Sequence, residues 1–147
     1  MKTVYRVLAY AIAALVAVQA AAIGYAVFAQ LHFIEGGGTL DGATIESAPG
    51  TGAFILHAIN GYGVLLAALA LLIISFFAKI PQGVRWAVIV LVCTVLQIAL
   101  GALSRLVAEI GAVHGAVALV LFGVAVTAAM RVRKPAVVEE PVPADAA

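Results

Sequence analysis

Charge is scarce in this sequence, and cysteine is almost absent. Only 10% of the 147 residues are charged and 65% are hydrophobic, which excludes an ordinary soluble domain and indicates an integral membrane protein in contact with a lipid bilayer. The formal net charge is +1, so no nucleic-acid partner is expected. The single cysteine, Cys93, has no second cysteine with which to form an intrachain disulfide.

Proline is missing from four long apolar stretches. Each stretch reaches or nearly reaches the ~20 residues that a helix needs to cross the hydrocarbon core. Backbone polar groups must be satisfied within the segment in lipid, so these stretches are expected to be helices. The expected spans are residues 4–31, 53–78, 86–106 and 112–130.

The connections between the spans predict the fold class. Short links near residues 79–85 and 107–111 force antiparallel neighbours, which predicts an all-α, up-down-up-down four-helix bundle over residues 1–134. Residues 32–52 form the longest loop, and residues 135–147 are expected to be a disordered cytoplasmic tail because three prolines interrupt them. The first span follows two basic residues like a signal peptide, but it exceeds the ~7–15 residues of a signal core, so we expect it to be retained.

The distribution of the basic residues predicts the orientation. Lysine and arginine gather before the first span, between the second and third, and after the fourth, whereas the opposite side carries Arg105 as its only basic residue. The positive-inside rule then places both termini in the cytoplasm of a multi-pass plasma-membrane protein. The clustered basic residues are Lys2, Arg6, Lys79, Arg85, Arg131, Arg133 and Lys134.

Two histidines lie just inside the start of two apolar spans. His57 is about four residues (~6 Å) below the start of the second span, and His114 about two residues (~3 Å) below the start of the fourth. Ionisable groups inside a membrane are costly and are functional candidates by default. Spans two and four run in the same direction and face each other across the bundle diagonal, so a flat macrocycle between them can take one imidazole on each face of its iron. The sequence therefore predicts a haem held by His57 and His114, attached without thioethers because no CxxCH motif is present.

The neighbouring residues suit such a cofactor. Gly61 and Ala118 lie one turn below the two histidines and leave room for a wide ring. Arg105 is placed to meet haem propionates, with an i+4 pairing to Glu109 as the alternative. Gln19 in the first span and Gln97 in the third are buried amides that either hydrogen-bond across the bundle or reach a macrocycle or quinone.

Other interpretations of the histidines remain open. Either imidazole can serve only as an interhelical hydrogen-bonding group, as polar side chains do in membrane bundles. Another metal is a further alternative, although a lone zinc ion normally takes three or four protein ligands.

The segment Gln97-Ile98-Ala99-Leu100-Gly101, a short turn and then Val113-His114 resembles the third and fourth helices of one half of a haem A synthase. The resemblance implies a four-helix bundle with haem-ligating histidines on its second and fourth helices, which His57 and His114 match. The chain is also similar to small four-helix haem-binding membrane proteins of unknown function. It departs from the synthases in having Phe54 where they carry a functional glutamate, no cysteine pair in its outer loop, and one bundle instead of two.

These observations predict a b-type membrane cytochrome with a non-covalent haem b and an electron-transfer or redox role. An iron with two axial imidazoles has no open position for oxygen, so an electron carrier is favoured over an oxygenase. A quinone or a respiratory complex is the expected partner, and a homodimer would imitate the double bundle of the synthases. The alternatives are a cofactor-free accessory or assembly subunit of a larger respiratory complex and a haem-handling protein.

Overall fold

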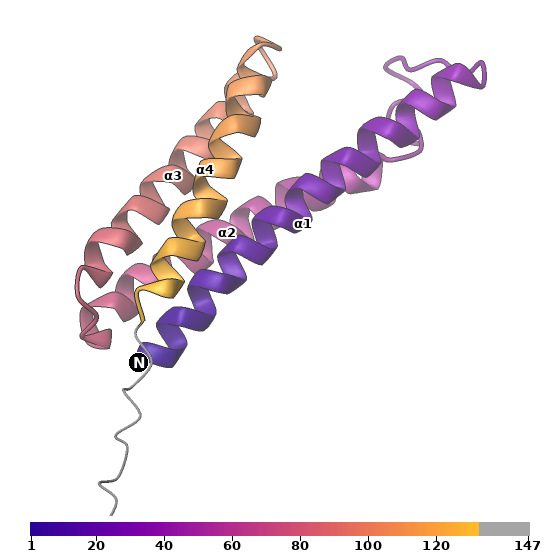
Figure 1. Ribbon diagram of the computed structural model, residues 1–147. Coiled ribbons are helices and arrows are strands. Elements are labelled where there is room, and N and C mark those ends of the chain that lie inside the picture. The colour runs from indigo at the N-terminus through magenta and orange to yellow at the C-terminus, as the bar shows by residue number, and fades with distance from the viewer. Residues whose placement is uncertain (133–147) are drawn as a thin grey trace, which may run out of the picture.

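Four long α-helices make up most of the described chain (Figure 1). The computed structural model describes residues 1–132, in which the helices are α1 (Lys2–Glu35), α2 (Thr51–Ala78), α3 (Gly83–Leu103) and α4 (Ile110–Met130). Each helix is long and apolar enough to cross a membrane, so the prediction of an all-α protein with four apolar spans is confirmed for this part of the chain. The predicted tail, residues 135–147, lies outside the described residues.

The helix ends differ from the expected spans by a few residues. α1 continues to Glu35 and ends at a run of three glycines, Gly36 to Gly38, in which Gly37 takes a positive φ of 91°. α3 begins at Gly83 and ends at Leu103, three residues before the expected end of its span. The first turn of α3 is fixed by the Tyr5 hydroxyl, which donates a hydrogen bond of 3.0 Å to the carbonyl of Gly83.

The helices form a ring in the order α1, α2, α3, α4. Each helix packs against the next, and α4 packs back against α1, so that α1 and α3 occupy one diagonal and α2 and α4 the other. Successive helices run in opposite directions along the bundle (Figure 1). This arrangement places the two histidine-bearing helices opposite each other.

The core lies at the end of the bundle that carries the N-terminus. Small residues there let the backbones approach closely, as is typical of membrane helices. Toward the other end, the α1–α2 hairpin and the α3–α4 hairpin separate (Figure 1). The buried alanines of the core are Ala9, Ala13, Ala68, Ala78, Ala87, Ala125, Ala128 and Ala129.

The loop before α2 is held by side chains at its turns. The Asp41 carboxylate accepts hydrogen bonds of 2.9 Å from the backbone N–H groups of Ala43 and Thr44. These bonds lower the pKa of Asp41, the bond from Thr44 most, since they favour the charged carboxylate. Thr51 then donates its hydroxyl proton to the carbonyl of Ile45 at 2.7 Å, which ties the first residue of α2 to the loop.

Gly50 sets the position of α2 against α1. It has a positive φ of 86°, and a Cβ there would lie 2.7 Å from the carbonyl oxygen of Ala26. We expect Gly50→Ala to cost about 1–3 kcal/mol, since a non-glycine residue is strained at this φ and the Cβ also meets backbone.

The measurement is thermal unfolding of the helices in detergent by circular dichroism, with a melting temperature lower by roughly 4 °C or more expected for Gly50→Ala. Gly52→Ala is the matched control because a Cβ on Gly52 has nothing within 4 Å. Equal melting temperatures for Gly50→Ala and the unaltered chain would show that α1 and α2 do not meet at this point.

Candidate functional site

His57 and His114 face each other across the α2–α4 diagonal. Their ring centroids are 6.1 Å apart and their planes are inclined by 63°. Both side chains are half-buried. The backbones of α2 and α4 do not approach each other closely, so the two imidazoles reach toward one another across the interior of the bundle.

The histidines extend the inward-facing stripes of their helices. The buried positions of α2 follow a spacing of four and three residues from Val64, and those of α4 do so from Leu121. His57 and His114 each lie seven residues before these positions, which is two helical turns on the same face. The bundle geometry therefore directs both rings inward at the level where the apolar core ends.

Glutamines on the other two helices complete the same layer. Gln19 lies three residues beyond buried Val16 on α1, and Gln97 lies three residues beyond buried Thr94 on α3. Each helix thus contributes one polar side chain, two imidazoles on one diagonal and two amides on the other. A polar layer across an otherwise apolar bundle is costly in a membrane unless its members bind one another or a ligand.

The ring of His114 is oriented by the backbone of α3. Its Nδ1 lies 3.1 Å from the carbonyl oxygen of Gln97, and because a carbonyl can only accept, Nδ1 carries the proton. Nε2 is then left with its lone pair available. A ligating histidine almost always uses its second nitrogen in this way, which fixes the ring and raises its basicity.

The ring of His57 is held mainly by the side chain of Gln19. With the amide turned so that its bonds are satisfied, Nε2 of Gln19 donates to Nδ1 of His57 at 2.7 Å and to the His57 carbonyl at 3.0 Å, while Oε1 accepts from the N–H of Gly61 at 3.2 Å. Nδ1 also lies 3.4 Å from the carbonyl of Gln19, a weaker contact that requires the opposite protonation state.

The orientation of the Gln19 amide therefore selects the tautomer of His57. When the amide donates to Nδ1, the ring proton is on Nε2 and that atom cannot bind a metal. A half-turn of the amide presents its Oε1 to Nδ1, moves the ring proton to Nδ1 and frees Nε2 of His57, at the cost of bringing Oε1 against the His57 carbonyl and the amide nitrogen against the N–H of Gly61. His114 is already in the tautomer that coordinates a metal, whereas His57 reaches it by turning Gln19.

The separation of the rings suits two axial ligands of one iron. An imidazole nitrogen lies about 2 Å from a bound transition metal, so two imidazoles on opposite sides of one iron have ring centroids about 6 Å apart, compared with 6.1 Å here. His57 and His114 would hold the iron of a haem bound between them, with Gln19 and Gln97 as the other polar side chains of this layer. The ring spacing and the protonation of His114 fit such a group.

The available His, Cys, Asp and Glu side chains also bear on whether a metal ion without a macrocycle can bind here. Among residues 1–132, no group of three or more His, Cys, Asp or Glu side chains is placed to hold a metal ion. An ion that takes all its ligands from protein needs three or four. A haem needs only the two imidazoles, because the macrocycle supplies the four equatorial nitrogens of its iron.

The other predicted site residues have different surroundings in the structure. Gly61 faces α1, where a Cβ would make an ordinary van der Waals contact of 3.6 Å with the side-chain amide of Gln19, so an alanine would also fit there. Ala118 is partly buried and packs on the edge of the apolar core. Arg105 is exposed in the turn after α3, and because α3 ends at Leu103, the helical i+4 pairing with Glu109 has no basis.

Gln97 contributes its backbone and leaves its side chain without a partner. Its carbonyl orients His114, while its Oε1 is buried and accepts no hydrogen bond within the described residues. A buried acceptor without a donor costs roughly 1–3 kcal/mol. This oxygen therefore favours a ligand or a water molecule that donates a proton to it, which is compatible with the cofactor-binding role predicted for Gln97.

Gln19 was expected to hydrogen-bond across the bundle or to reach a ligand, but its contact with His57 was not predicted, and neither was the contact of Gly101 with His114. The amide of Gln19 contacts His57, and a Cβ on Gly101 would lie 3.3 Å from Cε1 of His114. A Cβ at this position would crowd the imidazole, so the glycine helps α3 to lie close to His114. The four-and-three spacing of inward positions on α1 and α3 is the signal that places Gln19 and Gly101 in this layer.

Comparison with known proteins adds no relative: the chain matches no family model, no curated protein and no solved structure at a significant level.

Proposed function

We propose that this chain is a small b-type membrane cytochrome in which His57 and His114 are the two axial ligands of one haem. The observation that carries the proposal is the 6.1 Å separation of two imidazoles that approach from diagonally opposed helices. The hydrogen bond from Nδ1 of His114 to the Gln97 carbonyl supports it, since it leaves the metal-binding nitrogen free.

The proposed role is electron transfer or redox sensing. When both axial positions are filled by imidazole, the iron has no open site for oxygen, so an oxygenase activity is disfavoured. The protein's contributions are the two ligands, the hydrogen bonds to their second nitrogens and the apolar surroundings, all of which set a haem potential. A quinone or a subunit of a respiratory complex is the proposed redox partner. A homodimer of this chain is the proposed assembly.

The proposed topology follows from charge. Lys2, Lys79 and Arg131 lie at the end of the bundle that carries the N-terminus, whereas Glu35 and Asp41 lie at the other end. The positive-inside rule then assigns the N-terminal end to the cytoplasm of the plasma membrane. The histidine layer lies beyond the core toward the opposite, extracytoplasmic side.

The proposal is tested by expressing the chain with an ample haem supply and purifying it in detergent. We expect a Soret band, a reduced-minus-oxidised spectrum of the b type and about one non-covalent haem per chain. A colourless, folded protein that co-purifies with a larger respiratory complex would instead favour the accessory-subunit function.

A further inference from the structure

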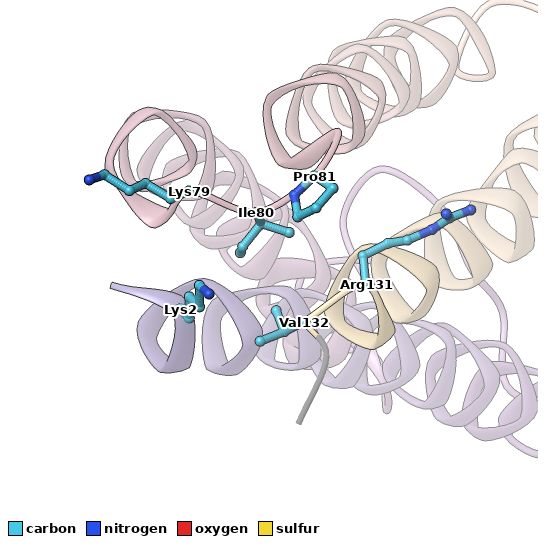
Figure 2. Close-up of a pocket in the computed structure, with 6 residues that line it drawn as sticks. All are labelled: Lys2, Lys79, Ile80, Pro81, Arg131 and Val132. Carbon is cyan, nitrogen blue, oxygen red and sulfur yellow. The ribbon is translucent and has the colours of Figure 1, made fainter. Parts of the chain in front are cut away.

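A second site lies at the opposite end of the bundle from the histidines. An open cavity of about 260 Å³ is lined there by three basic and three apolar residues. Figure 2 shows Ile80, Pro81 and Val132 between the basic side chains, with Lys79 and Arg131 extending to opposite sides. The basic residues are Lys2, Lys79 and Arg131.

The three cations come from three separate elements. Lys2 begins α1, Lys79 follows α2 and Arg131 follows α4. Lys79 is held at this point by a left-handed backbone conformation, with φ of 50°. The ring arrangement of the helices thus brings together basic residues that are up to 129 positions apart in the sequence. The positive charge of this cavity therefore does not come from several basic residues in a single loop.

Within residues 1–132, no acidic side chain lines the cavity. The described carboxylates, Glu35, Asp41, Glu46 and Glu109, lie near the far ends of the helices. Three like charges around one cavity repel one another, and a bound anion relieves that repulsion. Helices α1 and α3 begin at this end and α2 and α4 end there, so the helix dipoles oppose one another and the attraction for an anion comes from the three side chains.

The position of Arg131 is stabilised by an aromatic ring. Its guanidinium carbon lies 5.1 Å from the centroid of Trp86, within the range of a cation–π interaction. This contact links the end of α4 to the first turns of α3, and tryptophan is typical of the boundary between hydrocarbon and headgroups. The charged rim therefore lies at the level where lipid phosphates occur.

The apolar part of the lining favours an amphiphilic ligand over a free ion. Ile80 is buried, at 9% exposure, and with Pro81 and Val132 it gives the cavity an apolar floor below the charged rim. Basic pockets between membrane helices are known to take phospholipid headgroups. We propose that this cavity binds the phosphate of an anionic phospholipid, with the glycerol and upper acyl carbons against Ile80, Pro81 and Val132.

The test counts lipid bound to the purified protein in a neutral detergent micelle, where no charged bilayer surface contributes. Phosphatidylglycerol is titrated and retained lipid is measured by native mass spectrometry, with phosphatidylcholine as the zwitterionic comparison. The double variant Lys79→Gln/Arg131→Gln removes two charged contacts to the phosphate, each stronger than a neutral hydrogen bond, and is expected to bind phosphatidylglycerol at least roughly 25-fold more weakly.

The matched control is Arg6→Gln/Arg85→Gln, which removes two charges from the same end of the bundle but not from the cavity lining. Binding within about twofold of the unaltered chain is expected for this control. The proposal is overturned if both double variants lose affinity equally, or if 10-fold excess inorganic phosphate displaces the lipid. It is also overturned if phosphatidylcholine binds as tightly as phosphatidylglycerol.

Discussion

Replacing either His57 or His114 by alanine is expected to weaken haem binding by more than about 100-fold, because the loss of a ligand exceeds the 10–100-fold cost of disturbing its hydrogen-bonding partner. The two variants are not expected to be equivalent. His114 is already held in the coordinating tautomer by the Gln97 carbonyl at 3.1 Å, whereas His57 requires the Gln19 amide to turn. His57→Ala should therefore retain more haem than His114→Ala.

The measurement is haem titration of purified apo-protein, followed by addition of carbon monoxide to the reduced form. The unaltered chain should not bind carbon monoxide because both axial positions are occupied, while haem retained by either variant should bind it at the vacated position. His32→Ala is the control, since His32 is exposed near the end of α1 and is expected to change neither property.

A purely structural role for the histidines makes a different prediction. Loss of interhelical hydrogen bonds would lower the melting temperature of both variants without creating a carbon monoxide site. If the variants keep the haem content of the unaltered chain, the two imidazoles are not its ligands.

Replacing Gln19 by leucine is expected to have the second largest effect, a loss of haem affinity of about 10-fold or more. The prediction concerns the turned amide, whose Oε1 accepts the Nδ1 proton of His57 and leaves Nε2 of His57 free for iron; in the donating orientation, at 2.7 Å, the proton is on Nε2 instead. Without it, only the Gln19 carbonyl at 3.4 Å remains, a distance at which a hydrogen bond is weak. The His57 ring then loses both its orientation and part of its basicity toward iron.

The reduction potential should rise in the same variant. A stronger acceptor at Nδ1 makes the imidazole a better electron donor and favours ferric iron, so removing the Gln19 amide favours the ferrous state. A redox titration of the bound haem measures this shift, which an unspecific loss of packing would not produce.

Gln97→Leu is the matched control for Gln19→Leu. Both substitutions remove an amide from the same layer, but His114 is bonded to the backbone of residue 97, which leucine retains. We expect the potential to stay close to that of the unaltered chain. Equal shifts in the two variants would show that the Gln19 amide does not act through His57.

Hydropathy was sufficient to predict the helices. The placement of the two histidines on diagonally opposed helices followed from the short links between the helices. Four proline-free apolar runs and two short links determine four consecutive helices and their ring order, and the ring order makes α2 and α4 diagonal partners. The similar depths of His57 and His114, ~6 Å and ~3 Å below the starts of their spans, then follow from helical rise. Helix ends were less predictable, as for α3, because the turn over residues 104–109 contains apolar residues that resemble a continued span.

The contacts that orient the imidazoles depended on rotation about each helix axis, which hydropathy does not specify in a chain that is apolar on every face. The hydrogen bond of His114 uses a backbone carbonyl, and no side-chain pattern reports a backbone acceptor. The cavity lined by Lys2, Lys79 and Arg131 was unpredictable for a related reason. Its residues are distant in sequence, and only the packing of three helix ends brings them together.

Electron paramagnetic resonance of the ferric, haem-loaded protein tests the pair of axial imidazoles most directly. The account predicts a low-spin signal of a six-coordinate iron with two nitrogen ligands, converted to high spin in His57→Ala and His114→Ala and unchanged in His32→Ala. A high-spin signal in the unaltered chain would contradict the account, because it would mean that at least one of the two facing imidazoles does not reach the iron.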